Sequence, residues 1–501
     1  MTDDAGHHRL TPVELAAIAR GDVTTGFIRR LRAAELSKHK LLLEAVRRTA
    51  VDALSRDDEA VLAAALRTLG DVHARAPAVA EAVLVQPHVG GWAVDCLDRL
   101  ANGGFGREDL GYLAALAAVA GIRANVRFDA AILVRKGRAG FPGLGVLALP
   151  GAHGWASVRS DASEVTVTCG RRAVRLPADL AAQNDHWVPV QRVQVETDGL
   201  VLDAAIDCDD RFLHRFGARV RPLAPSDHNG WRDQVRDGWS LLARYHPATA
   251  RAIGTGPVTL VPLAEPVPGH SYSATSGWTF GAIAATRPVD GLSMAVTLVH
   301  EFHHLVLGAV EDVVSLAGQD SRTLCYAPWR DDPRPVGGLL QGVYAHLAMI
   351  QFWRRHRAAG PLEHRRRAEN ELARWRTVTF EAARTLVAAP DLTAAGRTVA
   401  KSMHELLASW QHEPLDAMAE RRATAMSAAH RSRWRLTHLH PDGEMINALA
   451  RAWLRGEPGS LMYGAWPSMA ERAQVAAALS VRLRSMVGDP PPESRVIQWL
   501  G

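Results

Sequence analysis

The feature that most constrains the fold is an uninterrupted, largely apolar segment at residues 292–307, which contains neither proline nor glycine. These two residues are the strongest helix breakers, so a run of this length predicts a helix. Asp290 and Ser293 are both acceptable N-caps, and the helix is expected to continue through Val310. Residues 300–304 read His-Glu-Phe-His-His, which matches the pattern H-E-x-x-H.

The pattern predicts a pair of imidazoles that can share one divalent ion. Residues four apart on a helix face have Cβ atoms about 5–6 Å apart, which applies to His300 and His304. Glu301 lies about 100° round the helix from His300, where it can reach a metal-bound water or a substrate group. His303 points elsewhere and is interpreted as structural. The alternative is an ordinary helix with no metal; an apolar lead-in and a strand expected at residues 277–284 favour the metal site.

A catalytic metal site needs a third protein ligand and an open position. His346 is the preferred third ligand, because it lies in the next expected helix and a ligand from a separate helix is the usual arrangement. Glu311, Asp312, Asp320 and Gln341 remain alternatives, with Asp312 better suited to orienting a ligand than to binding the ion. Two imidazoles suit zinc, iron, copper and nickel alike, so the sequence does not determine which metal binds.

The whole chain is predicted to be α+β and predominantly α-helical, with an antiparallel β region in the middle. A length of 501 residues exceeds one compact core. Four parts are expected: a helical N-terminal domain (1–138), a β-rich region (139–225), a catalytic core with the H-E-x-x-H helix (226–360) and a helical C-terminal region (361–501).

Apolar periodicity locates the elements. Helices are expected over most of residues 11–125, at 231–245, and at 337–358, 362–388, 394–430, 443–455 and 468–486. Strands are expected at residues 146–149, 165–168, 190–195, 200–202 and 258–261.

Charge and cysteine usage exclude several classes of protein. The net charge is only +5, and acidic residues are interspersed among 58 basic ones, so no nucleic-acid partner is expected. Four separated cysteines without a CxxC pair indicate neither disulfides nor a cysteine-based zinc site. No signal peptide or membrane-spanning run is visible. We expect a cytoplasmic protein with no membrane partner; its oligomeric state is open.

A proline-rich segment at residues 326–335 lies between two expected helices. Arg330 and Arg334 offer planar forks suited to a carboxylate ligand. A surface loop whose arginines pair with Asp331 and Asp332 is equally compatible with the sequence.

Four stretches of the sequence together resemble a known family. They are residues 300–304, the following residues 305–316, the sequence Trp-Arg-Asp-Asp-Pro-Arg-Pro at 329–335 and Gly-Leu-Leu-Gln-Gly-Val-Tyr-Ala-His-Leu at 338–347. The chain resembles the H-E-x-x-H peptide-modification proteins encoded near ribosomally made, post-translationally modified peptides in bacteria. The resemblance covers about residues 290–356.

The resemblance implies an Fe(II)- and 2-oxoglutarate-dependent peptide β-hydroxylase acting on a ribosomally made precursor peptide. Iron would bind His300, His304 and a third ligand, with His346 preferred. The distal carboxylate of 2-oxoglutarate would bind Arg330 first and Arg334 second. The commonest non-haem iron site uses a carboxylate as third ligand, so a histidine there is a departure.

Three further residues are expected around this site: Asp312, Gln341 and Tyr344. Two rival functions remain. In a zinc metallopeptidase, Glu301 would be the general base that deprotonates a zinc-bound water, although no extended H-x-x-G-x-x-H follows. The other rival is a non-enzymatic helical scaffold that binds peptides. The β region at residues 140–215 could bind a leader peptide by strand addition.

Overall fold

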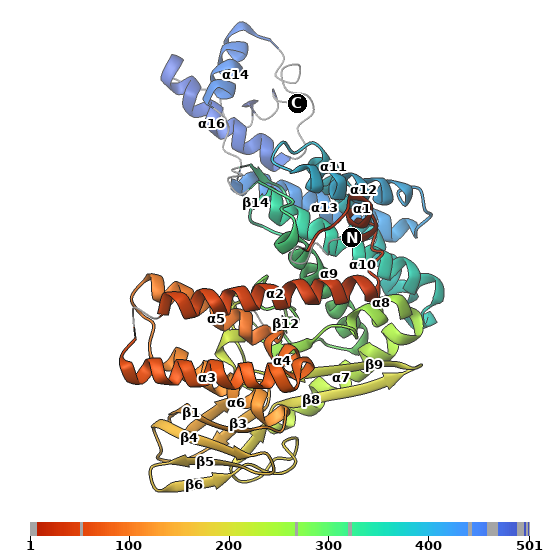
Figure 1. Cartoon of the computed structure of the whole chain (residues 1–501). Helices are drawn as coiled ribbons and strands as arrows, with labels where there is room; N and C mark the ends of the chain where they lie inside the picture. Colours follow the sequence, from red (N-terminus) through yellow and green to blue (C-terminus); the bar gives the residue numbers. More distant parts are fainter. Residues whose placement is uncertain are drawn as a thin grey trace, which may run out of the picture. The chain divides into compact units, whose positions relative to one another are not determined.

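The computed structural model of this chain describes residues 8–50, 54–265, 269–318, 323–438, 443–457, 469–487, 495–496 and 499. The fold is mostly helical α+β with an antiparallel curled sheet in the middle, as the sequence predicts (Figure 1). The chain divides into two compact units, Met1–Ser315 and Leu316–Gly501. This boundary falls inside the range 226–360, and the division into four parts stays a prediction.

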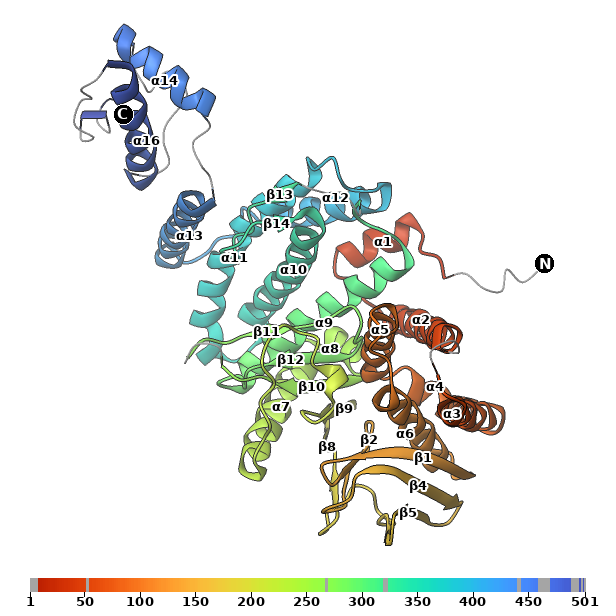
Figure 2. The ribbon, with the colours of Figure 1, turned by 90° about the vertical axis from the view of Figure 1, so that its left-hand side faces the viewer.

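Unit 1 begins with six helices, which confirms the helical interpretation of this region. They are α1 (Pro12–Ala19), α2 (Thr25–Ala50), α3 (Arg56–Arg75), α4 (Pro77–Leu84), α5 (Pro87–Ala101) and α6 (Arg107–Arg123). A capping box starts α1: the N–H of Glu14 donates to the Thr11 hydroxyl, and the Glu14 carboxylate accepts from the N–H of Thr11. Apolar α6 is buried along most of its length, because it packs between α3 and β1 (Figure 2).

A seven-stranded antiparallel sheet follows, in the order β6-β5-β4-β1-β2-β3-β7. Its strands are β1 (Arg127–Arg135), β2 (Arg138–Phe141), β3 (Gly145–Ala148), β4 (Gly154–Asp161), β5 (Val165–Cys169), β6 (Arg172–Arg175) and β7 (Trp187–Pro189). In β1 the buried residues alternate as strand geometry requires: Ala130, Ile132 and Val134.

The sheet begins earlier than residue 139, where the sequence analysis placed it. Strands β1, β2, β4, β6 and β7 were not expected. The segment Arg127–Arg135 combines two alanines and one leucine, which favour helix, with one phenylalanine, one isoleucine and one valine, which favour strand, so its composition did not decide between the two. This segment is a strand because eight of its residues pair with β4 in antiparallel register.

A second sheet carries the elements around the predicted helix. Its order is β11-β12-β10-β9-β8, formed by β8 (Gln191–Thr197), β9 (Leu200–Ile206), β10 (Val258–Pro262), β11 (Ser273–Ala274) and β12 (Ala282–Ala285). Strands β9, β10 and β12 are parallel, and the two edge strands are antiparallel. Every residue of β10 and β12 is buried, as expected for parallel strands covered on both faces.

The strand expected at residues 277–284 is wrong over its first part. A turn occupies those positions, Gly281 has a φ of +97°, and β12 starts only at Ala282. The strand expected at residues 258–261 is confirmed by β10.

Three helices accompany this sheet: α7 (Pro225–Tyr245), α8 (Pro247–Ile253) and α9 (Gly291–Val313). Two glycines bring α7 against α9. A Cβ added at Gly238 would lie 2.9 Å from the Gly291 carbonyl oxygen, and one added at Gly291 would lie 2.4 Å from the Cβ of Asp237. Glycine at these positions therefore permits the close packing that holds α9 in unit 1.

Where the structure describes unit 2, its regular elements are helices and a short strand pair, β13 (Leu324–Cys325) with β14 (Arg334–Pro335). Its described helices of more than one turn are α10 (Val336–Ala359), α11 (Arg365–Val387), α12 (Ala394–Ser409), α13 (Ala417–His438), α14 (Gly443–Arg455) and α16 (Met469–Val487). The single helix expected at residues 394–430 is wrong: α12 and α13 are separate, and Pro414 lies in the break. Within the described part of the chain, no helix has the length and apolarity to cross a bilayer.

Candidate functional site

Helix α9 contains the H-E-x-x-H residues, and its start is where the sequence predicts it. Asp290 is the N-cap, and its carboxylate accepts from the N–H of Ser293 at 2.6 Å. The helix buries its apolar face in unit 1, including Leu298, Phe302 and Val306. Buried side chains therefore lie before, within and after the turn that carries the histidines, and their packing holds it in place.

His300 and His304 lie together, as the spacing predicts. Their ring centroids are 4.8 Å apart and the planes cross at 84°. The His300 side chain is 20% exposed, so this pair lies at the edge of the buried region. Rings at this separation on successive turns of one helix suit the binding of a common transition-metal ion.

Glu301 is buried beside these rings rather than directed into solvent. Its Oε1 accepts a hydrogen bond of 2.6 Å from the hydroxyl of Ser273 in β11 and lies 3.9 Å from Nε2 of His300 (Figure 2 shows β11 and α9 together). Burial raises the pKa of Glu301 to about 7, while hydrogen bonds from Ser273 and Thr275 oppose that shift. The carboxyl group is therefore held in place by the edge strand of the sheet.

His303 has the environment of a structural histidine. It is 5% exposed, and Nδ1 lies 2.7 Å from the carbonyl oxygen of Val299. Burial lowers its pKa to about 4, so the ring is neutral near pH 7. Its ring also meets that of Phe302 edge-on.

Asp312 binds a lysine of another helix. Its Oδ2 is 2.7 Å from Nζ of Lys38 in α2, and the same ammonium is 2.6 Å from Glu35. Glu311 precedes it in the last turn of α9, whereas Asp320 lies outside the described residues. The carboxylate of Asp312 thus links α9 to α2, and its role in orienting a metal ligand stays a prediction.

The preferred third ligand, His346, lies in unit 2 on α10. The ring is 5% exposed, stacks on Trp329 with centroids 4.1 Å apart, and meets Trp375 edge-on at 4.8 Å. Nδ1 is 2.8 Å from the Gly342 carbonyl oxygen. Because a carbonyl only accepts, Nδ1 is the donor in this contact, so Nε2 is the nitrogen through which a neutral ring could bind a metal.

Gly342 makes this arrangement possible. A Cβ at this position would lie 2.3 Å from the ring of Trp329. Only glycine lets the indole lie flat against α10 and over His346.

Both predicted cofactor-binding arginines pair with one carboxylate. Arg330 donates from Nε to Asp332 at 2.7 Å, and Arg334 donates to the other oxygen of the same group at 3.2 Å. Asp331 instead faces His430 and Arg433. This is the pairing that the surface-loop interpretation predicts, with Asp332 as the partner of both arginines. To bind them, a 2-oxoglutarate carboxylate would have to replace the carboxylate of Asp332.

Gln341 and Tyr344 complete the predicted set, both on α10 in unit 2. Tyr344 is fully buried, and burial raises the pKa of its hydroxyl far above the usual range. Gln341 is half-buried one residue before Gly342. Neither position assigns a chemical role.

The predicted residues therefore fall into two sets. Unit 1 holds His300, Glu301, His304 and Asp312, and unit 2 holds Arg330, Arg334, Gln341, Tyr344 and His346. No group of three or more His, Cys, Asp or Glu side chains in the described ranges is arranged to hold a metal ion. The imidazole pair of α9 fits two coordination positions, and a third donor has to be added to it.

No protein-family model matches this chain. No curated protein matches it significantly either.

Sequence reasoning missed Ser273, which holds Glu301, and the two tryptophans around His346. Ser273 lies far before Glu301 in the chain, so no local spacing connects them. Trp329 could have been noticed, because it belongs to the stretch that carries the family resemblance. Trp375 has no such signal, since its approach to His346 depends on how α11 packs on α10.

Proposed function

We propose that this chain is an Fe(II)- and 2-oxoglutarate-dependent hydroxylase that acts on the β-carbon of a residue in a ribosomally synthesised peptide. The observation that carries the proposal is the imidazole pair of His300 and His304, with ring centroids 4.8 Å apart on one helix. The choice of an oxygenase is supported by the resemblance of residues 290–356 to the peptide-modification family.

Each residue has a specific role in this proposal. His300 and His304 bind the ion, and His346 is the proposed third donor through Nε2, since Nδ1 donates to a backbone carbonyl. Arg330 binds the distal carboxylate of 2-oxoglutarate in exchange for Asp332. Held by these residues, iron and 2-oxoglutarate would supply the oxidising power for inserting one oxygen atom of O₂ into a peptide C–H bond, with 2-oxoglutarate converted to succinate and carbon dioxide.

A second candidate, a zinc metallopeptidase, is favoured by the position of Glu301. Its Oε1 is 3.9 Å from Nε2 of His300, which suits a base that takes a proton from a metal-bound water. Against this role, Glu301 is only 2% exposed and already accepts a hydrogen bond from Ser273.

One experiment distinguishes the two. The full chain is purified without metal and given Fe(II), ascorbate, 2-oxoglutarate and a precursor peptide encoded near its gene, and succinate and peptide mass are measured. Succinate that requires both iron and peptide, with a gain of one oxygen atom, supports the hydroxylase. Peptide cleavage that requires zinc and is lost in Glu301→Gln supports the peptidase instead.

The matched control for the metal pair is His186→Ala, because His186 is an exposed loop histidine of the same unit. We expect His300→Ala to abolish turnover and His186→Ala to retain it. If the chain binds no metal and shows neither activity, both enzymatic proposals are overturned and the scaffold interpretation is left.

A further inference from the structure

Unit 1 contains a cavity of about 590 Å³ to which no residue of α9 contributes. Its walls come from α6, strands β1 to β3, β7 and the start of β8, the loop after β9 and the first turns of α7. Ligand-binding cavities typically measure about 300–1,000 Å³. The cavity is therefore large enough for a ligand. None of the catalytic, metal-binding or cofactor-binding residues that the sequence predicts lines it.

Part of the wall is apolar. Leu133, Phe141, Val146 and Ile206 contribute side chains. Gly140 adds open space, because nothing lies within 4 Å of where its Cβ would be. This wall suits an aliphatic chain rather than a compact ion.

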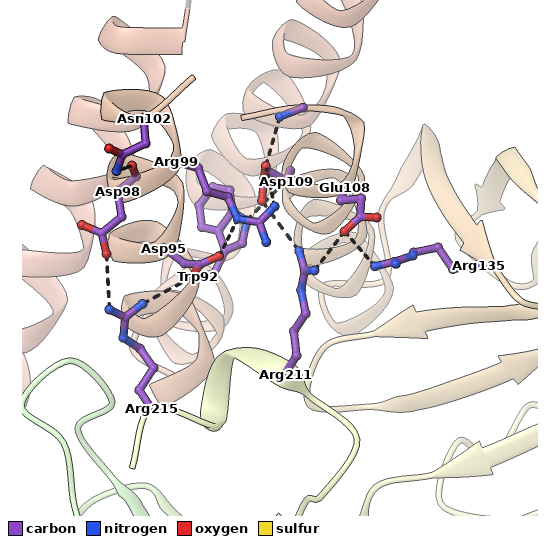
Figure 3. A network of polar contacts seen from close by, with 11 residues as sticks. Trp92, Asp95, Asp98, Arg99, Asn102, Glu108, Asp109, Arg135, Arg211 and Arg215 are labelled. Carbon is purple, nitrogen blue, oxygen red and sulfur yellow. Dashed lines mark hydrogen bonds and ion pairs between the residues drawn. The ribbon is translucent and has the colours of Figure 1, made fainter. Parts of the chain in front are cut away.

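Most charges around the cavity neutralise one another. Glu108 accepts from Arg211 at 2.9 Å and from Arg135 at 2.7 Å, and Figure 3 shows these three side chains converging between α6, β1 and the loop after β9. Arg138 pairs with Asp209 at 3.0 Å. These side chains are between about a third and just over a half exposed, so they form a polar rim.

Other groups of the wall have no such partner among the described residues. Arg232 donates only to the amide oxygen of Gln191, and Asp207 is left without a cation. It directly follows β9, lines the cavity and is only 5% exposed. Oδ1 accepts the backbone N–H groups of Asp209 and Asp210 at 3.0 and 3.1 Å. Oδ2 makes no hydrogen bond or ion pair with any residue that the structure describes. Among the ionisable side chains of the cavity wall, that of Asp207 is the most deeply buried.

A neighbouring carboxyl group increases the negative potential. Asp210 lines the same cavity and accepts hydrogen bonds from the Tyr112 hydroxyl at 2.5 Å and the Phe212 N–H at 3.0 Å. Neither bond brings a full positive charge. A buried carboxylate without a cation is costly, and a ligand that brings one offsets that cost.

We propose that this cavity binds the lysine or arginine side chain of a peptide, with Asp207 as the partner of the cationic head group. The aliphatic stem of such a side chain packs on apolar walls while its head group reaches a carboxylate. That the cation belongs to a peptide rests on the proposed function, whereas the preference for a cation rests on the cavity itself.

The test is calorimetric titration of the full chain with short blocked peptides. The peptides are Ac-Ala-Leu-Lys-Leu-Ala-NH₂ and the same sequence with norleucine or glutamate replacing lysine. Norleucine keeps the stem and removes the charge. We expect the lysine peptide to bind at least tenfold more tightly than either, and equal binding of lysine and norleucine peptides overturns the proposal.

Two variants locate the binding. Asp207→Asn keeps the Oδ1 acceptor and removes the charge, so we expect at least tenfold weaker binding of the lysine peptide. The matched control is Asp203→Asn in β9, whose side chain pairs with Arg192 and does not line the cavity; its effect should be below twofold. Nothing lies within 4 Å of a Cβ added at Gly140, so we expect Gly140→Leu to occupy cavity space and abolish binding; circular dichroism checks that the chain stays folded.

The outcome is separable from that of the proposed function. Binding is measured again in the double variant His300→Ala/His304→Ala, which should bind the lysine peptide as the natural chain does even if no hydroxylation is ever found. If n-butylamine binds as tightly as the lysine peptide, the cavity recognises a small amine and the peptide assignment is overturned. No binding of any probe, or full binding by Asp207→Asn, overturns the site itself.

Discussion

Lys38 of α2 forms an ion pair with Asp312 of α9, with 2.7 Å between Nζ and Oδ2. The same ammonium group lies 2.6 Å from Glu35, which is only 1% exposed, and donates to the carbonyl oxygen of Gly277 at 2.9 Å. One lysine thus connects the N-terminal helices to the last turn of α9 and to the loop before β12.

We expect Lys38→Met to destabilise the chain by about 2–3 kcal/mol, because it removes the cation that pairs with Asp312 and lies against the buried Glu35, whose pKa burial raises to about 8. This value is below that of a fully buried pair because Asp312 is a third exposed. Urea unfolding followed by circular dichroism measures it. Lys40→Met is the control: Lys40 is exposed and 3.9 Å from Glu81, so its loss should be below about 0.5 kcal/mol. Equal losses would contradict the bridging role.

Metal binding should depend on both imidazoles of α9. We expect His300→Ala and His304→Ala each to lower the affinity for Fe(II) or Zn(II) by more than about tenfold, since each removes a direct ligand. Metal content per chain after equilibrium dialysis measures this, with His186→Ala as control. Full metal content in the double variant would remove the basis of the proposed function.

Arg330→Ala should weaken 2-oxoglutarate binding by about tenfold or more, because a charge-assisted hydrogen bond is worth about 1.5–3 kcal/mol. Metal content should not change, since Arg330 is not a metal ligand. Titration of the iron-loaded chain with 2-oxoglutarate measures the affinity. Arg334→Ala, which shares the partner Asp332, should have a smaller effect; unchanged affinity in Arg330→Ala would exclude that arginine.

The buried Asp207 should make stability depend on pH. Burial and the neighbouring Asp210 raise its pKa from 3.8 to about 7; Asp209 also faces it, and Tyr112 donates to Asp210. A raised folded-state pKa contributes stability below about pH 4 that is lost as pH rises through 7. Relative to Asp207→Asn, the natural chain should lose a few kcal/mol over this range, about 1.4 for each unit of pKa difference.

Unfolding in urea at pH 4.5, 6 and 8 measures this difference. The control variant Asp203→Asn removes an exposed carboxylate and should follow the natural chain at every pH. A constant difference between the natural chain and Asp207→Asn would show that Asp207 keeps an ordinary pKa.

Gly342→Ala should displace Trp329 from its position over His346. The added Cβ would lie 2.3 Å from the indole, and such overpacking costs about 1–3 kcal/mol. Near-ultraviolet circular dichroism should report the moved tryptophan. Gly337→Ala in the first turn of α10 is the control, because its nearest atom is 3.7 Å away; it should be neutral or stabilising by up to about 1 kcal/mol.

Much of the fold could be predicted from local pattern alone. The start of α9 at Asp290 follows from an N-cap and a run without glycine or proline, and α10 follows from apolar periodicity. Strand β1 could not be predicted in this way, because its alanines and leucine also suit a helix and only the pairing with β4 distinguishes the two. The break between α12 and α13 was missed although Pro414 marked it.

The sequence by itself determined that His300 and His304 lie on one helix face, because four residues are slightly more than one turn of 3.6 residues and no distant contact is needed. Only the tertiary structure decided what surrounds the chemically active groups. Ser273 reaches Glu301, Lys38 reaches Asp312, and Asp207 is enclosed with no cation paired to it among the described residues, through contacts between segments far apart in the chain. The physical reason is that periodicity reports which face of an element is buried, whereas the partner it meets depends on the packing of other elements.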